Sequence, residues 1–366
     1  MKAAIDRAEW SRALALVGAA VPSRTPKEIL FNVRLTAEDG DSARLFATNL
    51  DRDAEATFPA SVFEPGTVLL PADRLKTILA SATASDLELS SDESSVLIQA
   101  GKSRFRMPAA NPDLYPDPSP WNVGGPIEVD AVDLAVAIRR VEFSTDVDST
   151  RYALGGAVFT SGPGLTLVST DSVRLSMATL ATPSDLSGLT DLTHVVPADA
   201  LKAIVKALPD SGPVSLAFGK TSFVLDAPPA RVSGRLIEGR FPRYRDVVDD
   251  AAAVRFAFET SAGGLAAAIS QAAVAASNES RWCDFTFGDA ALRIDCRSAD
   301  LGDAHAEVEI DYSGPSFTIG LNPFRLIQAL KAIGPVPVKF EVLGERRPIV
   351  LRADGYDHFL QPVTKG

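Results

Sequence analysis

Prolines at fixed intervals constrain the fold of this chain more than any other feature of its sequence. Pro71, Pro197 and Pro323 each open a stretch with apolar residues at helical spacing, and the intervals 71 to 197 and 197 to 323 both span 126 residues. Proline is favoured in the first turn of a helix, where its missing N–H costs nothing. Matching apolar positions follow each proline: Leu75, Leu201 and Ile327, and then Ile78, Ile204 and Leu330. This fixed period indicates three copies of one structural module.

Each repeat contains two stretches with helical periodicity, and alternating segments typical of strands lie between and after them. In the first stretch, Trp10, Ala13, Leu14 and Val17 share one face. The expected helices span residues 5–20, 69–82, 130–143, 195–208, 262–276 and 322–333. A few coincidental alignments, which any α+β chain yields, are the alternative to a true repeat.

Segments rich in Gly, Pro or Asp separate the repeats, at residues 122–126 and near Asp249 and Asp250. A chain of 366 residues is too long for one hydrophobic core, and each repeat is large enough to bury a core of its own. The expected domains are 1–122, 127–249 and 253–366.

The clearest strand pair lies in the second repeat, at residues 151–175. We expect an extended arm, a turn at Ser161–Gly164 and a second strand that ends in Thr170–Leu175. The hairpin ends at Asn49–Asp51 and Ala299–Asp300 align with it. Nothing in this stretch indicates catalysis.

Several classes of protein are disfavoured by the composition. No apolar run approaches the roughly 20 residues of a membrane span, and the N-terminus lacks the apolar core of a signal peptide, so we expect a cytoplasmic protein. Cys283 and Cys296 flank a predicted hairpin, and we interpret them as buried free thiols rather than a disulfide framework. His194, His305 and His358 are too far apart to indicate a metal site. We expect no cofactor.

The charge of the chain is unevenly distributed. The net charge is -11, which by itself argues against nucleic-acid binding. Many acidic residues fall in loops, however, whereas the predicted helices carry Arg7, Arg12, Arg74, Lys76, Arg139, Arg140, Lys202, Lys206, Arg325 and Lys331. This pattern predicts one surface that faces a polyanion. Ordinary solvated helix faces are the alternative, and the helix at 262–276 has no Lys or Arg at all.

A series of local motifs runs along nearly the whole chain. They are VPSR at 21–24 followed by Ile29–Leu30, SRFRMPA at 103–109, EFSTDVDSTRYALGG at 142–156, STDSVRL at 169–175, IEGRFPRYRDV at 237–247, SNES at 277–280, LNPFRLIQAL at 321–330 and QPV at 361–363. In this order they resemble the bacterial DNA polymerase III beta subunit, the sliding clamp. No motif is a catalytic signature.

The resemblance implies an α+β fold of three DNA-clamp domains, each with two helices and two small antiparallel sheets. Two chains would close head to tail into a homodimeric ring around duplex DNA. The ring would tether the polymerase and perform no chemistry. The implied partners are double-stranded DNA of any sequence, the polymerase III alpha subunit and the clamp loader, with no membrane.

The resemblance also assigns residues to DNA and to the second copy of the chain. The implied DNA-contacting residues are Arg24, Arg74, Lys76, Arg139, Arg140, Tyr152, Lys202 and Lys206. Arg24 could instead be a plain loop residue, and Tyr152 a core aromatic. The strand with Phe105 and Met107 is expected to meet the third domain of the other copy near Ala275 and Ala276.

One apolar cleft in the family takes short peptides from partner proteins. The matching positions are Leu154, Thr170, Ser172, Arg174, Leu175, Pro242, Asp246, Val247, Asn322, Arg325, Pro362 and Val363. A few anchor residues dominate binding in such concave sites. Leu154, Leu175 and Val247 could instead be core residues.

The sequence departs from the family at this cleft. Asp246 stands where the family has a basic residue, Arg325 stands where it has an aromatic one, and Arg281 or Trp282 replaces an apolar side chain. We therefore expect Asp246 and Arg325 to pair and the peptide preference to be altered.

Two other functions remain as alternatives to the main replication clamp. One is a clamp homologue with altered partners, acting as an alternate or regulatory copy. The other is an enzyme, for which the sequence offers no convergent set of catalytic residues.

Overall fold

A computed structural model describes residues 1–92, 94–148, 152–161, 164–182, 193–251, 254–276 and 282–363. The contacts divide the chain into two compact units. Unit 1 is formed mainly by Met1–Ala135 and Asp199–Ile237, and unit 2 mainly by Val136–Ala181 and Glu238–Gly366. The division runs through the second sequence repeat, because its strands pair partly with the first repeat and partly with the third. The domain limits expected from the sequence therefore remain a prediction.

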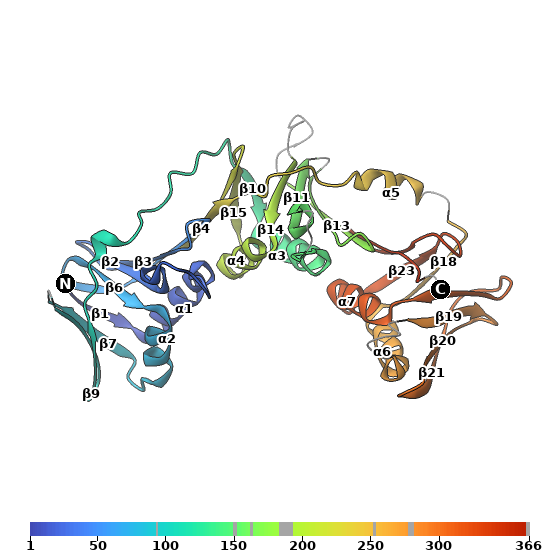
Figure 1. Ribbon diagram of the computed structural model, residues 1–366, viewed down its shortest axis with the longest axis horizontal. Coiled ribbons are helices and arrows are strands. Elements are labelled where there is room, and N and C mark those ends of the chain that lie inside the picture. Colours follow the sequence, from blue (N-terminus) through green and yellow to red (C-terminus); the bar gives the residue numbers. More distant parts are fainter. Residues whose placement is uncertain are drawn as a thin grey trace. The chain divides into compact units, whose positions relative to one another are not determined.

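Unit 1 contains two antiparallel sheets (Figure 1). The smaller sheet has the order β5 (Ser61–Glu64), β1 (Lys2–Asp6), β7 (Asp86–Ser91), β8 (Ser95–Ala100) and β9 (Ser103–Pro108). The larger sheet has the order β10 (Ile127–Asp130), β15 (Pro213–Phe218), β16 (Ser222–Ala227), β17 (Ala230–Arg235), β4 (Arg52–Pro59), β3 (Ser42–Thr48), β2 (Asn32–Ala37) and β6 (Gly66–Pro71). The pairing of β17 with β4 joins strands of the second and first repeats.

The helices α1 (Arg7–Val17), α2 (Ala72–Ser81) and most of α4 (Ala198–Ala207) lie in unit 1. The buried face of α1 consists of Trp10, Ala13, Leu14 and Val17, as its periodicity predicted. Arg52 of β4 is buried and pairs with Asp199 of α4, with 2.9 Å between its guanidinium and the carboxylate. This ion pair ties α4 to the first repeat.

Unit 2 also contains two antiparallel sheets. The larger has the order β14 (Thr193–Pro197), β11 (Gly156–Ser161), β12 (Leu165–Thr170), β13 (Arg174–Leu180), β25 (Tyr356–Leu360), β24 (Ile349–Ala353), β23 (Pro337–Val342) and β18 (Phe256–Ser261). The smaller has the order β21 (Gly302–Glu309), β20 (Ala291–Ser298), β19 (Cys283–Gly288) and β22 (Phe317–Leu321). Here β13 pairs with β25, which joins the second repeat to the third.

Helices α6 (Ala262–Ala272) and α7 (Pro323–Ile333) pack together in unit 2, and α5 (Tyr244–Asp250) lies in the segment before β18. Helix α3 (Ala131–Val141) contributes to both units. Short 3-10 turns are η1 (Gly18–Ala20), η2 (Glu28–Phe31), η3 (Pro112–Leu114), η4 (Glu142–Ser144), η5 (Tyr152–Gly155) and η6 (Ala273–Ala275). None of the described helices is long and apolar enough to cross a membrane.

The structure confirms the α+β class and the six expected helices, and it corrects several details. Sheets of neighbouring repeats join across the repeat boundaries, so the described part of the chain holds four sheets. The arm before β11 is the 3-10 turn η5 rather than an extended segment. Helix α5 was not expected, because its sequence is polar and short. Of the expected turn at 161–164, Gly162 and Pro163 lie outside the described residues.

The cysteines also differ from expectation. Cys283 and Cys296 are fully buried and form a disulfide between β19 and β20, with 4.4 Å between their Cα atoms. Directly opposed residues at a non-hydrogen-bonded position of an antiparallel pair lie at about this distance. The sequence showed a hairpin but not its register, so the pairing of the two thiols could not be foreseen.

Candidate partner and DNA-binding sites

The turn between β12 and β13 forms the centre of the candidate partner site in unit 2. Asp171 Oδ1 accepts hydrogen bonds from the backbone N–H groups of Val173 at 3.0 Å and Arg174 at 2.9 Å. Thr170 Oγ1 donates to the Arg174 carbonyl at 2.6 Å and accepts from the Ser172 N–H at 3.1 Å. These bonds hold Ser172 at a φ of 73°, a left-handed conformation that is uncommon for a residue with a side chain.

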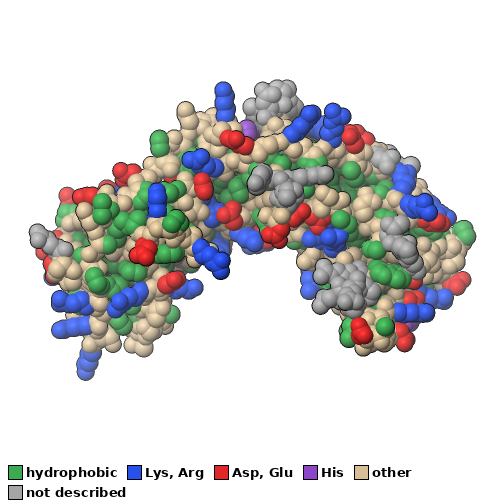
Figure 2. Space-filling view, in the orientation of Figure 1, with side chains coloured by type: hydrophobic (Ala, Val, Ile, Leu, Met, Phe, Trp, Pro, Cys, Tyr) green, Lys and Arg blue, Asp and Glu red, His purple; other side chains and the backbone are tan. Residues whose placement is uncertain are grey.

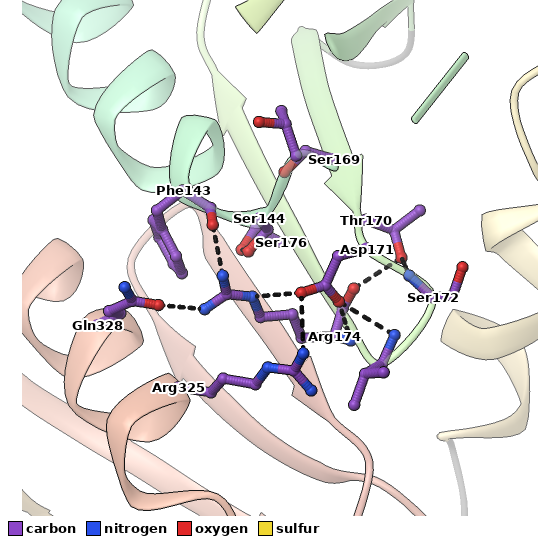
Figure 3. A network of polar contacts seen from close by, with 12 residues as sticks. Phe143, Ser144, Ser169, Thr170, Asp171, Ser172, Arg174, Ser176, Arg325 and Gln328 are labelled. Carbon is purple, nitrogen blue, oxygen red and sulfur yellow. Dashed lines mark hydrogen bonds and ion pairs between the residues drawn. The ribbon is translucent and has the colours of Figure 1, made fainter. Parts of the chain in front are cut away.

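Arg174 is held by three different elements (Figure 3). Its guanidinium donates to Asp171 Oδ2 at 3.1 Å, to Gln328 Oε1 of α7 at 2.5 Å and to the Phe143 carbonyl at 2.6 Å. Burial lowers the pKa of Arg174, and the charge of Asp171 opposes that shift. The side chain therefore connects the turn to α7 in one fixed orientation.

Arg325 of α7 points toward the same carboxylate (Figure 3). Its guanidinium lies 3.6 Å from Asp171 Oδ2. The expected pair between Asp246 and Arg325 is therefore wrong. Arg325 instead forms an ion pair with Asp171, which the hairpin turn holds beside the first turn of α7. No spacing in the sequence signals this contact, because more than 150 residues separate the two side chains.

Asn322 and the C-terminal segment complete this part of the site. Asn322 caps α7, because its side-chain oxygen accepts from the N–H groups of Phe324 at 3.1 Å and Arg325 at 3.2 Å. The Gln361 N–H donates to the Val173 carbonyl at 2.9 Å, and the Val363 N–H donates to the Gly320 carbonyl at 2.9 Å. Pro362 and Val363 are half-buried. The predicted residues of the turn, α7 and the tail are thus brought together.

A buried polar cluster lies beneath the turn and was not found from the sequence. Ser176 contacts Ser144 at 2.7 Å between hydroxyl oxygens, and it lies 2.9 Å from Nδ1 of His358. Burial, and secondarily the charge of Arg174, lowers the pKa of His358 to about 3. Burial raises the pKa of Tyr356 in the same cluster. The imidazole is therefore neutral at physiological pH.

The remaining cleft residues fall elsewhere in unit 2. Leu154 and Leu175 are buried in the core, which was the alternative interpretation for them, and Val247 is half-buried. Pro242 and Asp246 line a groove of about 860 Å³ along β11, together with the arginines at 240, 243 and 245. Trp282 is described, whereas Arg281 and the SNES motif lie outside the described residues.

The predicted DNA-contacting residues are mostly on the surface. The exposed ones are Arg24, Arg74, Lys76, Arg139, Lys202 and Lys206. Arg140 is partly committed to the fold, because it donates to the Asp354 carbonyl at 2.8 Å and lies 5.5 Å from the centre of the Tyr356 ring. Tyr152 begins η5, and its side chain lies outside the described part.

Each of the four sheets ends in strands that are paired on one side only, and two of these terminal strands carry opposite charge. β9 is the last strand of the smaller sheet of unit 1, and β21 is the last strand of the smaller sheet of unit 2. Lys and Arg side chains gather over β9 (Figure 2). Arg104 and Arg106 are exposed on β9, whereas Asp303, Glu307 and Glu309 are exposed on β21.

The residues expected at the contact with a second copy are less accessible than predicted. Phe105 is half-buried, whereas Met107, Ala275 and Ala276 are buried within their own units. The exposed residue near the two alanines is Val274, which is 71 % exposed. Helical periodicity could not find it, because α6 ends at Ala272 and Val274 lies within the 3-10 turn η6.

Comparison with known proteins identifies the family. Family models of the DNA polymerase III beta subunit match the chain in three parts: the N-terminal domain at residues 1–119, the central domain at 128–243 and the C-terminal domain at 256–364. The chain belongs to the DNA polymerase III beta subunit family. It is a sliding clamp of this polymerase, a processivity factor without catalytic activity of its own.

Relatives extend over nearly the full chain. The beta sliding clamp of Caulobacter vibrioides is 28% identical over 360 residues, which is 96% of this chain and 95% of the relative. The beta sliding clamp of Haemophilus influenzae is 25% identical over 342 residues, which is 91% of this chain and 90% of the relative.

Solved structures of sliding clamps have the same fold. One is the Caulobacter crescentus clamp, solved with polyethylene glycol bound to a putative beta-motif tethering region. Its TM-score is 0.88 at 26% identity, and the match covers 100% of this chain and 99% of that chain. The Bartonella birtlesii clamp, solved with griselimycin bound, has a TM-score of 0.91 at 23% identity with both chains covered to 100%.

Proposed function

We propose that two copies of this chain close head to tail into a ring that encircles duplex DNA and tethers the replicative polymerase in the cytoplasm. The single observation that carries the ring is the pair of unpaired edges with opposite charge, β9 and β21. Pairing of different surfaces on two copies generates a closed ring when the rotation closes. It also covers the free edges of β9 and β21, since exposed strand edges are prone to aggregation.

The side-chain pattern of the two edges supports this pairing. Residues alternate between the two faces of a strand, so Arg104 and Arg106 share one face of β9 while Phe105 and Met107 share the other. On β21, Asp303, Glu307 and Glu309 share one face, and Ala304, Ala306 and Val308 share the other. An edge-to-edge pair therefore places basic side chains near acidic ones and apolar side chains near apolar ones.

We assign DNA binding to the exposed basic residues of the helices. Lys202 and Lys206 lie one turn apart on α4, and Arg74 and Lys76 lie on α2. Contacts of such residues to phosphates carry no sequence information. They are also weakened by salt, because binding releases condensed counterions. A closed ring held this way remains on DNA of any sequence and can slide along it.

The partner site is proposed at the turn of β12 and β13, α7 and the C-terminal segment. This arrangement supports docking of a short linear peptide, because it combines half-buried apolar residues with the fixed polar groups of Asp171 and Arg174. The polymerase III alpha subunit and the clamp loader are the proposed donors of such peptides. Pro242, Asp246 and Val247 remain proposed members of this site.

A loading assay tests the ring. With clamp loader and ATP, the protein should be retained on nicked circular DNA and lost when that DNA is linearised, since a sliding ring runs off a free end. Lys202→Glu with Lys206→Glu should reduce retention most at low salt, and the difference from the wild type should shrink as salt is raised, because the removed contacts are themselves weakened by salt. A protein that is monomeric at micromolar concentration in sedimentation, or that stays equally on linear DNA, would contradict the proposal.

A second candidate function is that of an alternate or regulatory clamp with changed partner preference. The ion pair between Arg325 and Asp171 favours it, because it brings a second cation into the candidate partner site. Fluorescence polarisation with the Gln-Leu-x-Leu-Phe peptide discriminates the two functions. Ordinary low-micromolar binding removes the second candidate.

A further inference from the structure

Two guanidinium groups share one carboxylate at the candidate partner site. Asp171 Oδ2 lies 3.1 Å from Nε of Arg174 and 3.6 Å from a terminal nitrogen of Arg325. The other oxygen of Asp171 is occupied by two backbone N–H groups. The carboxylate therefore balances one of the two positive charges and has little capacity left for the second.

The two arginines differ in what they can still bind. Arg174 is 9 % exposed in its side chain, and Asp171, Gln328 and Phe143 occupy its guanidinium. Arg325 is 32 % exposed, and within the described residues the ion pair with Asp171 is the one polar interaction found for its guanidinium. An arginine has five N–H donors in a planar fork that matches a carboxylate. Most of the donors of Arg325 thus remain free and reachable from solvent.

The surroundings strengthen this excess charge. Asp171 is only 12 % exposed, so water screens the cluster weakly. The nearby His358 is fully buried and neutral, and it contributes no counter-charge. Asp357, on the adjacent strand β25, is already paired with Arg352, and Glu341, on β23 farther along the sheet, is paired with Lys339 and Arg352.

We propose that Arg325 is a specificity-determining residue that makes the partner site select peptides carrying a carboxylate beside their apolar anchors. The carboxylate completes the cluster of two arginines and one aspartate and receives the free N–H donors of Arg325. This inference rests on the proposed peptide-docking function. The carboxylate belongs either to an Asp or Glu side chain of the partner peptide or to the C-terminus of the partner.

Competition binding with three peptides separates the sources. The peptides are acetyl-Gln-Leu-Ala-Leu-Phe as an amide, the same peptide with a free C-terminal carboxylate, and the amide with Asp in place of Ala. A hydrogen-bonded carboxylate should improve affinity about tenfold, the gain expected for a hydrogen bond to a charged group. The gain should shrink as the salt concentration is raised.

Variants assign the preference to Arg325. In Arg325→Gln the advantage of the carboxylate peptides should fall below about twofold, since the side chain keeps hydrogen-bond donors but loses its charge. Arg293→Gln is the matched control, because Arg293 is also an ion-paired, partly exposed arginine of unit 2. It should leave the preference unchanged.

The outcomes are distinguishable. Equal binding of all three peptides, or a preference that persists in Arg325→Gln or is insensitive to salt, overturns the inference and leaves peptide docking intact. Failure of every peptide to bind the wild-type ring overturns both this inference and the proposed peptide-docking function.

Discussion

The side chain of Arg174 is only 9 % exposed, and three acceptors from separate elements surround its charge. Removing one partner of a buried ion pair is costly, since the remaining charge loses its compensation. The turn between β12 and β13 keeps Ser172 at a positive φ, and in this conformation the Asp171 carboxylate points at the guanidinium of Arg174. Backbone strain at this residue is thus offset by the polar contacts it makes possible.

His358 gives the molecule an acid-sensitive component of stability. In the unfolded chain its imidazole titrates near the ordinary pKa of 6.5, whereas burial lowers the pKa to about 3 in the folded state. Between these values only the unfolded state binds the proton. The free energy of unfolding is therefore highest above pH 6.5 and falls by about 2 kcal/mol between pH 7 and pH 5 from this group alone.

Urea denaturation of wild type and His358→Gln at pH 7 and pH 5 checks this prediction. The variant should lose less stability on acidification than the wild type. His305→Gln, at an exposed histidine that lies 3.0 Å from Asp295, tests whether the loss of any histidine has the same effect. An equal acid response of wild type and His358→Gln would show that this imidazole is not the cause.

At the scale of elements, α7 positions the arginine that defines the partner site. The helix begins at Pro323 after the Asn322 cap and ends at Ile333, before Gly334, whose φ of 87° suits a residue without a side chain. Its buried face is apolar, including Leu326, Leu330 and Ile333. Arg325 follows the cap closely, so its direction depends on how the first turn is held.

Loss of the cap should therefore lower the stability of the protein. Asn322→Ala leaves the N–H groups of Phe324 and Arg325 without their acceptor and should cost about 1 kcal/mol of stability. Thermal unfolding measures this cost. Asn322→Asp keeps the acceptor and should restore the midpoint. An Asn322→Ala variant with the same unfolding midpoint as the wild type would contradict the capping role of Asn322.

For the whole molecule, the proposed ring depends on complementary charge at β9 and β21. Like charges opposed across a strand pair destabilise it. Arg104→Glu with Arg106→Glu reverses one edge, and Asp303→Lys with Glu309→Lys reverses the other. Each double variant alone should associate at least about tenfold more weakly.

Mixing the two double variants should restore assembly. In a mixed ring, one interface has both edges reversed and the other has both edges native, so opposite charges meet at each. Sedimentation of the separate and mixed proteins measures this. Dimers from either variant alone, or monomers in the mixture, would contradict the proposed pairing of edges.

The sequence by itself determined the three repeats, the six long helices with their buried faces and the family. These features depend on local periodicity and spacing, such as the apolar face of α1 and the equal intervals between Pro71, Pro197 and Pro323. Local patterns are visible in a single chain because neighbouring residues set them. The exposure of Arg74, Lys76, Arg139, Lys202 and Lys206 on the helices followed for the same reason.

Only the tertiary structure decided which distant groups meet. It paired Arg325 with Asp171 instead of Asp246, joined Cys283 to Cys296, buried Met107 and left Val274 exposed. Each of these outcomes depends on strand register or on the path of a turn, and both are set by packing between segments far apart in the sequence. The partner site shows the contrast most clearly: its residues were predictable one by one, but the shared carboxylate at its centre was not.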